Sequence, residues 1–458
     1  MTYNAIHFVG IGGIGMSALA VLCRARGAVV SGSDIKSSLL LKRLRGQGIR
    51  VCLGHGPDNL GRADLVVYSS AVRRDNPELS AARARGVPLM RRAQCLAGLM
   101  RGSRPIIVSG CHGKTTTASL AACMLRQAGW DPTAVIGGIV RDWGSNVCIG
   151  RGDYFVAEGD ESDGTFLEYR PVYSLVTNIE SEHMDYYKNY PALLSCFQRF
   201  IRRTRPQGCV FAAGDDRDLR RIISRYPLRY VTFGLGADCM LRGVDVEYGE
   251  YSLSFGCLYQ GRPWGRRFEL ALPGEHNLRN ALAVVALARE LGIGEDVVYR
   301  SLKGYKGAGR RFEIKSRSRE YLVVDDYAHH PTEIRATLSV LRGLRERERY
   351  NRVIAIFQPH RYTRTQYLWD DLAGSFSAAD HLIITDIYPA GEAAIHGVSS
   401  RLLCRRISSF GKACAEFLPR PQIIGRVLKM RRPGDIIVTL GAGDVGELSN
   451  ELSAGIRD

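Results

Sequence analysis

Short apolar runs alternate with amphipathic stretches along the chain, a pattern typical of proteins in which parallel strands alternate with helices. A strand, a glycine turn, a helix and a second strand at the N-terminus make the βαβ unit that opens a Rossmann-like domain. In the first hundred residues the pattern predicts strands at 6–9, 28–34 and 64–70, and helices that end near residues 27, 85 and 100.

The same alternation continues towards the C-terminus, with a more polar interval at 228–272 that is predicted to be rich in strands. Strands are also predicted at 106–109, 154–158, 174–178, 209–212, 321–325, 352–357, 381–385 and 435–440, and an apolar helix at 281–291. A chain of 458 residues exceeds the size at which one core stops growing. We therefore predict an α/β protein of three domains, 1–102, 103–309 and 310–458, with a glycine-rich hinge at 304–309.

Composition narrows the class of protein. With 45% hydrophobic and 24% charged residues and no low-complexity tract, the chain is typical of a soluble globular protein. The twelve cysteines form no CxxC pair, which favours reduced thiols and a cytoplasmic location. The apolar stretch 5–23 is long enough for a membrane helix, but four glycines within it favour a βα turn, so we expect no membrane insertion.

The formal net charge of +17 leaves a nucleic-acid-binding ATPase open as one class of function. The arginines are spread over the whole length, however, and clusters such as 200–205 form no stripe interleaved with aromatic residues. We therefore assign most of this charge to solvated surface and expect no nucleic-acid partner.

The most informative motif begins at the predicted strand 106–109, which runs directly into a Gly-Cys-His-Gly-Lys-Thr turn and a helix at 114–127. Gly113 lets the backbone approach an anion, and the free N–H groups of the first helical turn point at it. Lys114 neutralises the anion, and the Thr115 hydroxyl is a ligand for Mg²⁺. Val108 stands where the general P-loop has a glycine, yet the motif predicts a nucleoside triphosphate site.

A second glycine turn follows the first strand as Gly10-Ile11-Gly12-Gly13-Ile14-Gly15, with Asp34 about twenty positions further on. This is the fingerprint of dinucleotide-binding domains, but the same geometry serves any diphosphate. The turn predicts a diphosphate ligand and leaves a nicotinamide-dependent oxidoreductase open. Asp34 either holds a ribose hydroxyl or caps the turn.

Charged residues also follow the strands of the central and C-terminal regions, where α/β proteins bind ligands. The run 158–163, Glu-Gly-Asp-Glu-Ser-Asp, suits Mg²⁺ that bridges phosphate oxygens, although a solvated acidic turn is the alternative. His183, after the strand 174–178, either ligates a metal or supports a loop. The loops 325–331 and 357–365 carry paired aspartates and two arginines, and they form either one binding site or two capped turns.

Together these motifs resemble the Mur ligase family over essentially the whole chain. The matching stretches are 10–17, 31–34, 75–78, 110–117, 160–163, 177–185, 276–280, 309–313, 325–331 and 357–365. The resemblance implies an N-terminal Rossmann-like domain that binds a UDP-sugar, a central P-loop-type ATPase and a C-terminal Rossmann-like domain that binds an amino acid. The stretch 191–205 contains no lysine that is comparable to the carbamylated lysine of many relatives, which is consistent with the alanine-adding branch.

The resemblance also implies a role for individual residues. For the UDP-sugar it implies Gly12, Gly13, Gly15, Asp34, His55 and Ser70. For ATP it implies Gly110, Cys111, His112, Gly113, Lys114, Thr115, Thr116, His276, Asn280, Arg310, Arg311 and Asp326. Thr115 and Glu158 would ligate one Mg²⁺, and Glu158 with His183 a second, which makes Lys114, Glu158 and His183 the implied catalytic residues. Tyr327, His329, Arg361 and Arg364 would line the region of the amino acid and the muramoyl carboxylate.

The implied activity is ATP-dependent formation of an amide between UDP-N-acetylmuramate and L-alanine, through an acyl phosphate, with Mg²⁺ as a cofactor. The alternative within the family is a ligase that adds a recycled tripeptide to the same nucleotide sugar. We expect a monomer or a weak homodimer. Cys111 stands where the family usually has threonine, and its place at a helix N-terminus leads to the hypothesis of an oxidation-prone thiol with a low pKa.

Overall fold

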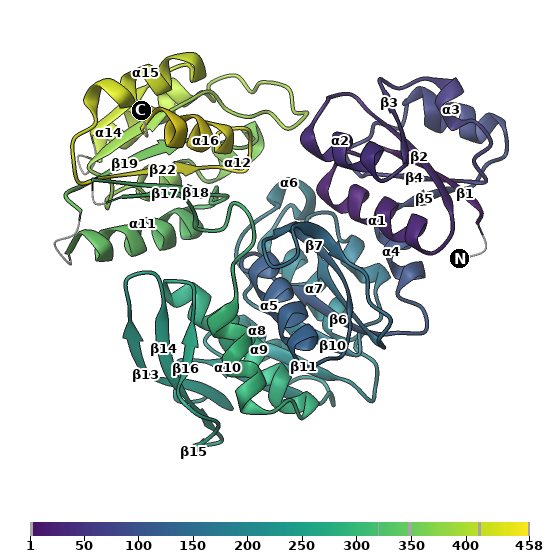
Figure 1. Cartoon of the computed structure of the whole chain (residues 1–458), viewed down its shortest axis with the longest axis horizontal. Coiled ribbons are helices and arrows are strands. Elements are labelled where there is room, and N and C mark those ends of the chain that lie inside the picture. Colours follow the sequence, from purple (N-terminus) through teal and green to yellow (C-terminus); the bar gives the residue numbers. More distant parts are fainter. Residues whose placement is uncertain (1–2, 319, 347–349, 411–413, 457–458) are drawn as a thin grey trace.

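The structure is a computed structural model that describes residues 3–318, 320–346, 350–410 and 414–456. Figure 1 shows three sheets, each with its own helices: a purple N-terminal sheet, a teal central sheet and a green-to-yellow C-terminal sheet. We keep 1–102, 103–309 and 310–458 as the proposed domains, because these boundaries fall between the three sheets.

The N-terminal sheet has five parallel strands in the order β3-β2-β1-β4-β5. The order reverses between β1 and β4, so the glycine turn after β1 lies where Rossmann-like sheets bind their ligands. Its elements are β1 (Ala5–Val9), α1 (Ile14–Ala25), β2 (Val29–Asp34), α2 (Leu39–Gly46), β3 (Arg50–Leu53), a 3-10 turn (Pro57–Leu60), β4 (Leu65–Tyr68), α3 (Pro77–Ala84), β5 (Leu89–Arg91) and α4 (Arg92–Leu99). The Rossmann-like prediction for this region is confirmed.

The central sheet has β6 in its middle, flanked by the parallel strands β9 and β10. Its first elements are β6 (Arg104–Ser109), α5 (Lys114–Gln127), β7 (Thr133–Val140), β8 (Ser145–Cys148), β9 (Tyr154–Gly159), a 3-10 turn (Thr165–Glu168), β10 (Tyr173–Val176), α6 (Met184–Tyr187), α7 (Tyr190–Ile201), β11 (Cys209–Ala213) and α8 (Arg217–Ile223). The strand-rich interval predicted at 228–272 is confirmed as β12 (Tyr230–Gly234), β13 (Leu241–Tyr248), β14 (Leu253–Tyr259), β15 (Arg262–Pro263) and β16 (Phe268–Leu270). The helices α9 (Glu275–Leu291) and α10 (Glu295–Gly304) complete it.

The C-terminal sheet has six strands in the order β17-β18-β22-β19-β20-β21, of which β17 is antiparallel. Its elements are β17 (Glu313–Arg317), β18 (Tyr321–Asp326), α11 (Pro331–Glu346), β19 (Arg352–Phe357), α12 (Tyr362–Tyr367), α13 (Trp369–Ala373), β20 (His381–Ile384), α14 (Ser400–Ser409), β21 (Cys414–Phe417), α15 (Arg420–Met430), β22 (Asp435–Leu440) and α16 (Gly446–Gly455). The loops after β18 and β19 therefore emerge on either side of β22 at the same edge of the sheet.

Two local predictions differ from the structure. Helix α9 begins at Glu275 and not at Ala281, because Gly274, with φ of 95°, ends the preceding segment and the polar residues that follow already form the first turns. The glycine-rich stretch 304–309 is attached to β7, since Gly309 N–H donates to Ile139 O at 2.8 Å and Val140 forms a bridge with Ala308. Its role as a hinge stays a prediction.

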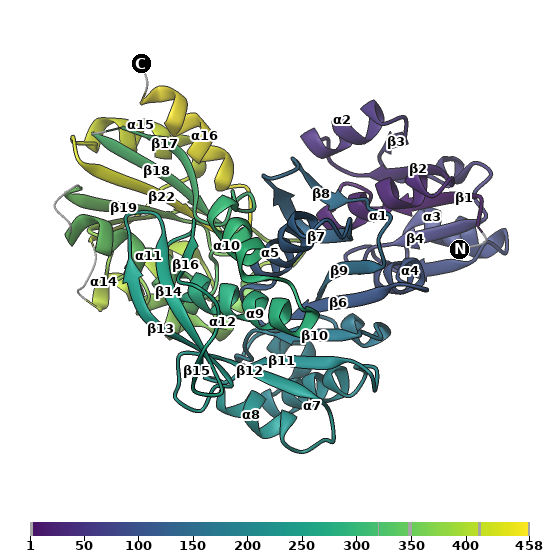
Figure 2. The same cartoon turned by 60° about the horizontal axis from the view of Figure 1, so that its bottom comes forward.

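The hydrophobic core is divided unevenly among the domains. One continuous cluster runs from Ile6 in β1 to Tyr305 after α10, so it joins the N-terminal and central domains. The C-terminal sheet has separate clusters on its two faces, one beneath α11 and one beneath α15 and α16. Figure 2 shows α1 against β7 and β8, which is the contact that unites the first two domains. Among the described residues, no helix is both long and apolar enough to cross a membrane.

Candidate active site

The phosphate loop connects β6 to α5 and carries two glycines that the geometry requires. Gly110 and Gly113 have φ values of 130° and 82°, and a Cβ on either would collide with Thr177 or Asn280, respectively. The loop is therefore shaped by its neighbours in β10 and α9 as well as by its own sequence. Lys114 starts α5, so the free N–H groups of the first helical turn face the same side as its ammonium group.

Lys114 is held by a carboxylate that sequence reasoning did not single out. Its Nζ lies 2.8 Å from both carboxylate oxygens of Glu161, which is buried, and 2.6 Å from Gly110 O. Burial opposes the charge on Lys114, but the nearby carboxylate of Glu161 outweighs it and raises the pKa of the lysine. The only sequence signal for Glu161 was its membership of the acidic run after β9.

Glu158 and Thr115, the pair predicted to hold Mg²⁺, lie side by side. Thr115 Oγ1 donates to Glu158 Oε2 at 3.1 Å, and Gly137 N–H donates to Glu158 Oε1 at 2.6 Å. Burial raises the pKa of Glu158, so its charged form lacks full compensation. Two hard oxygen donors beside a phosphate loop fit a divalent cation that completes this compensation.

His183 lies in a different environment from the one expected for a shared metal. Its Nε2 is 3.5 Å from Glu161 Oε1 and 3.9 Å from Glu182 Oε1. The residue has a left-handed backbone, with φ of 58° and ψ of 36°, a conformation that costs energy outside glycine and that clusters at functional sites. Its joint ligation of a metal with Glu158 stays a prediction.

A cavity of about 490 Å³ lies between the central and C-terminal domains. The predicted ATP residues that line it are His112, Gly113, Thr116, His276, Asn280, Arg311 and Asp326. His276 and Asn280 belong to the first turns of α9, and burial lowers the pKa of His276 to about 4, so its ring is neutral at pH 7. Asn277, also in this lining, belongs to the matching stretch 276–280 but was not singled out as a site residue.

The structure separates the two arginines that precede β17. Arg311 lines the cavity, whereas the Arg310 guanidinium binds Asp325 Oδ2 at 3.1 Å, Gly443 O at 2.8 Å and Gly441 O at 2.6 Å. Arg310 therefore braces the turn after β22 and is not among the residues that line the cavity, and its role in binding ATP stays a prediction. Asp326 lines the cavity, and burial raises its pKa to about 6.

The hypothesis of a reactive Cys111 is wrong. Its side chain is buried, and its Sγ lies 3.3 Å from Glu180 O and 3.1 Å from Glu180 N. Burial, together with the carboxylates of Glu161 and Glu182, raises the pKa of this thiol well above its usual range. The helix N-terminus alone would lower the pKa, but residues far along the chain decide the outcome.

A second cavity of about 360 Å³ lies between the loop after β10 and helix α12. Arg361 and Arg364 line it together with Glu182, His183 and Asp185. The prediction that the loops after β18 and β19 meet is supported by the ring of His329, whose centroid lies 5.7 Å from that of His360. Tyr327 does not line this cavity, because its ring packs beside the guanidinium groups of Arg310 and Arg311.

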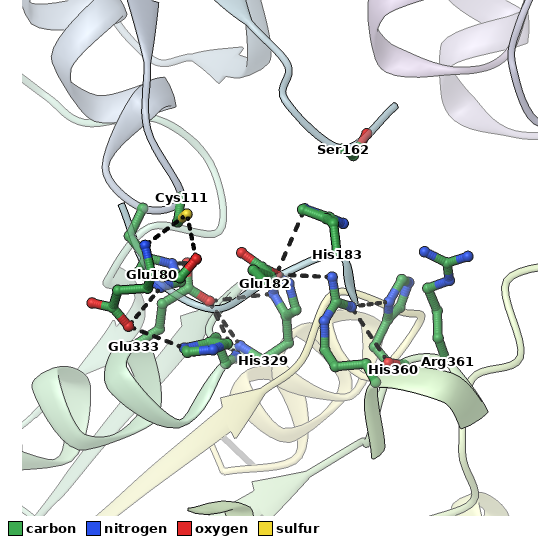
Figure 3. A network of polar contacts seen from close by, with 12 residues as sticks. Cys111, Ser162, Glu180, Glu182, His183, His329, Glu333, His360 and Arg361 are labelled. Atoms are coloured by element: carbon green, nitrogen blue, oxygen red, sulfur yellow. Dashed lines mark hydrogen bonds and ion pairs between the residues drawn. The ribbon is translucent and has the colours of Figure 1, made fainter. Parts of the chain in front are cut away.

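Polar contacts join the two domains around these cavities (Figure 3). Glu182 accepts from Arg364 at 2.9 Å, Asp185 from Arg361 at 3.3 Å, and Glu180 from Thr332 at 2.6 Å. Figure 3 also shows Glu333 beside the phosphate-loop region, where its Oε1 lies 3.2 Å from His112 Nδ1. Each carboxylate except Glu333 belongs to the loop after β10.

In the N-terminal domain, Asp34 caps the glycine turn. Its Oδ2 accepts from Gly12 N–H at 2.9 Å, and a Cβ on Gly12 would lie 2.8 Å from the same oxygen. His55 lies 2.9 Å from Ser33 Oγ, and Ser70 is exposed in the turn after β4. The glycines Gly13 and Gly15 lie in the same turn, so the residues predicted for a UDP-sugar gather at this edge of the sheet.

Two further polar residues at this edge were missed. Glu78 is fully buried, and burial opposes its charge, but His7, followed by the hydrogen bonds from Ser33 and Asn59, lowers its pKa to about 2. Arg92 lies against Gly15 and forms an ion pair with Asp160 at 3.2 Å, so it connects the glycine turn to the acidic loop of the central domain.

Comparisons with known proteins agree along the whole chain. Residues 5–104 match the model of the Mur ligase family, catalytic domain; 108–288 match the Mur ligase middle domain; and 310–443 match the Mur ligase, glutamate ligase domain. The chain is 45% identical to a UDP-N-acetylmuramate--L-alanine ligase of Anaeromyxobacter sp. (strain Fw109-5), over 98% of this chain and 96% of the relative. It is 42% identical to the protein of the same name from Geotalea uraniireducens, over 98% and 97%.

Solved structures show the same likeness. A UDP-N-acetylmuramate-alanine ligase from Thermotoga maritima is 30% identical, covers 99% of both chains and superposes with a TM-score of 0.85. A murein peptide ligase from Psychrobacter arcticus, 24% identical with a TM-score of 0.74, covers 99% of this chain and 98% of its own and shows the shared fold alone.

Proposed function

The chain belongs to the Mur ligase family, and from that premise we propose that it joins L-alanine to the muramoyl carboxylate of UDP-N-acetylmuramate at the expense of ATP. This is a step of peptidoglycan precursor synthesis. The observation that carries the proposal is the position of the loop after β10 at the domain interface. Its Glu180 contacts Cys111 of the phosphate loop, and its Glu182 binds Arg364 of the C-terminal domain. We further propose a cytoplasmic location, where ATP is available.

In the proposed reaction the muramoyl carboxylate attacks the γ-phosphate of ATP, which gives an acyl phosphate and ADP. The amine of alanine then attacks the acyl carbon and displaces inorganic phosphate. The larger cavity suits ATP, with the adenine near His276 and Asn280 and the phosphates towards Lys114. Lys114 would exchange its contact with Glu161 for phosphate oxygens, and so stabilise the charge that develops during phosphoryl transfer.

Thr115 and Glu158 would hold Mg²⁺ beside the phosphates. A bound Mg²⁺ neutralises phosphate charge and orients the γ-phosphoryl group. In the same proposal His183 lies beside Glu161, at the end of the site where carboxylates gather. Closure of the C-terminal domain would exclude water that hydrolyses the acyl phosphate.

The UDP-sugar is assigned to the N-terminal domain. Gly12, Gly13 and Gly15 would face its diphosphate, with Asp34, His55 and Ser70 nearby. The glycine turn lies at the N-terminus of α1, which favours an anion. The ion pair between Arg92 and Asp160 supports a path for the sugar from this turn towards the phosphate loop.

The test is phosphate release from ATP and Mg²⁺ with UDP-N-acetylmuramate and, in separate reactions, L-alanine, glycine, L-serine or the tripeptide. We expect release that requires both the nucleotide sugar and L-alanine. Lys114→Ala should lower the rate by roughly 10²- to 10³-fold, because it removes a preorganised charge from the transition state. Lys303→Ala, which changes an exposed lysine of α10, is the matched control.

Release with the tripeptide alone would assign the chain to the recycling branch instead. Release that ignores the nucleotide sugar would contradict the proposed substrate altogether.

A further inference from the structure

Glu182 is a buried carboxylate at the centre of the site, and phosphoryl transfer as described above does not use it. Its side chain is 5% exposed, it follows β10, and it lines the smaller cavity. Its Oε1 is 2.9 Å from Arg364 Nη2, 3.9 Å from His183 Nε2 and 3.8 Å from His329 Nε2. Figure 3 shows it between His183 of its own loop and His329 of the C-terminal domain.

The neighbours of His329 determine which of its nitrogens carries the proton. Nδ1 lies 2.9 Å from Tyr327 O and 3.3 Å from Glu333 Oε2, and both of these atoms only accept hydrogen bonds at neutral pH. Burial and the charge on Arg364 lower the pKa of His329 to about 4, so the ring is neutral. The proton of a neutral ring therefore resides on Nδ1, and Nε2 is a free acceptor.

Two acceptors, Glu182 Oε1 and His329 Nε2, thus face each other at 3.8 Å. Such a pair is unfavourable by itself and becomes favourable when a donor with several N–H groups binds both. A primary ammonium group is a donor of this kind. Glu182, Arg361 and Arg364 line the cavity of about 360 Å³, so a carboxylate for a cation and guanidinium groups for a carboxylate lie within one space. His329 is not part of this lining but approaches it through Glu182.

A purely structural role for the contact between Glu182 and Arg364 explains less. Other contacts, between Asp185 and Arg361 and between Glu180 and Thr332, already join the central domain to the C-terminal domain. These two contacts form without a fully buried carboxylate and without an unprotonated imidazole nitrogen beside the carboxylate. The negative charge of Glu182 and the positive charge of Arg364 are complementary to the ammonium and carboxylate groups of an amino acid, and His329 adds an uncharged acceptor.

We propose that Glu182 binds the ammonium group of the amino acid substrate, beside His329 and Arg364, which the family resemblance already places at the amino acid. In the structure Glu182 and Arg364 bind each other, and alanine inserts between them with each of its charges replacing one partner. This proposal rests on the proposed function and deepens it, because it assigns the ammonium group to a residue of the central domain.

The experiment compares two nucleophiles with the variant Glu182→Gln. L-Alanine needs recognition of its ammonium group, whereas hydroxylamine is neutral at pH 8 and traps the acyl phosphate as a hydroxamate without it. We expect kcat/KM for L-alanine to fall about 10- to 100-fold, the cost of one hydrogen bond between charged groups. Hydroxamate formation from ATP and UDP-N-acetylmuramate should stay within about threefold of the wild-type rate, and Glu182→Asp should recover part of the activity with alanine.

Asp435→Asn is the matched control, because Asp435 is also buried and paired with an arginine, Arg352, but lies outside both cavities. It should lower stability without changing KM for L-alanine. If Glu182→Gln lost hydroxamate formation as severely as the alanine reaction, Glu182 would act in phosphoryl transfer or in folding, and the proposal would be overturned. It would also be overturned if kcat/KM for L-alanine changed less than about threefold.

Failure of the proposed function has a different signature. It would appear in the wild-type protein, as phosphate release that depends on the tripeptide and not on alanine. The comparison with hydroxylamine would then apply unchanged to the ammonium group of that peptide.

Discussion

The central domain contacts its two neighbouring domains through different kinds of interaction. Towards the N-terminal domain, α1 packs against β7 and β8 and the two domains share one hydrophobic cluster. Towards the C-terminal domain, the contacts around the cavities are ion pairs and hydrogen bonds, such as Glu182 with Arg364 and His112 with Glu333. Apolar packing fixes one arrangement, whereas charged contacts can be exchanged for the charges of a ligand. We therefore expect the first interface to stay fixed and the second to open and close.

The largest expected effect would weaken the hydrophobic cluster that the two domains share. Leu19 in α1 is fully buried in the shared cluster, so Leu19→Ala should cost about 2–5 kcal/mol of stability. Because the cluster is continuous, hydrogen exchange measured by mass spectrometry should accelerate in both the N-terminal and central domains.

The control for this prediction is Leu338→Ala, which removes a fully buried leucine of α11 from a cluster of the C-terminal domain. Its effect should be confined to residues beyond 310. If Leu19→Ala accelerated exchange only within residues 5–100, the two domains would not form one cooperative unit, and the contrast between the interfaces would fail.

The next effect concerns how the stability of the charged interface depends on pH. Burial opposes the charge on His112, but Glu333 and Glu180 outweigh it and raise the pKa of this histidine to about 10. In an open form Glu333 leaves while Glu180 stays, so the pKa of His112 falls from about 10 only part of the way towards its ordinary value of about 6.5. The pKa of His112 is higher in the closed form than in the open form. The contribution of His112 to the stability of the closed form is therefore complete below about pH 6.5 and is lost as the pH rises towards about 10.

Small-angle scattering between about pH 6 and pH 10 should therefore show the closed form give way to a more extended one, with a loss of about 1.5–3 kcal/mol. His112→Gln should remove most of this pH dependence. An unchanged profile in the variant would show that other groups hold the domains together.

The smallest effect is expected at the exposed rim of the same interface. Asp185 and Arg361 are each about one-third exposed and 3.3 Å apart, so Asp185→Asn should shift closure by less than about 1 kcal/mol. Scattering at low and high salt measures this, because salt screens an exposed pair more strongly than a buried one. If Asp185→Asn changed the free energy of closure by as much as Leu19→Ala is expected to change the free energy of unfolding, the exposed pair would be more than a weak contact that a ligand can replace.

Much of the fold was predictable from the sequence because its strands are apolar and most end in glycine or charge. The turn at Gly110–Lys114 and the acidic run after β9 needed only the rule that ligands bind at the carboxyl ends of parallel strands. The start of α9 was not predictable in this way, since Leu278 is the only apolar residue from Glu275 to Asn280 and several of the others face a cavity, so the stretch shows no apolar helical period.

Residues whose roles depend on distant partners were harder to identify. Glu78 reads as an ordinary acid in the first turn of a helix, and only the tertiary structure brings Ser33 and Asn59 to it. Arg310 and Arg311 are equivalent in sequence, and the backbone alone turns one towards Asp325 and the other into the cavity. The hypothesis for Cys111 came from its place before a helix N-terminus, but burial, and after it the carboxylates of Glu161 and Glu182, raise its pKa.

The larger cavity takes its walls from two domains, with Asn280 on one side and Glu333 on the other. For inhibitor design, this divides compounds into two kinds. A compound that occupies only the central-domain wall would compete with ATP in any arrangement of the protein. A compound that contacts both walls would bind best to the closed form, prolong it and trap the products, so its residence time would be set by domain opening and not by its own contacts alone.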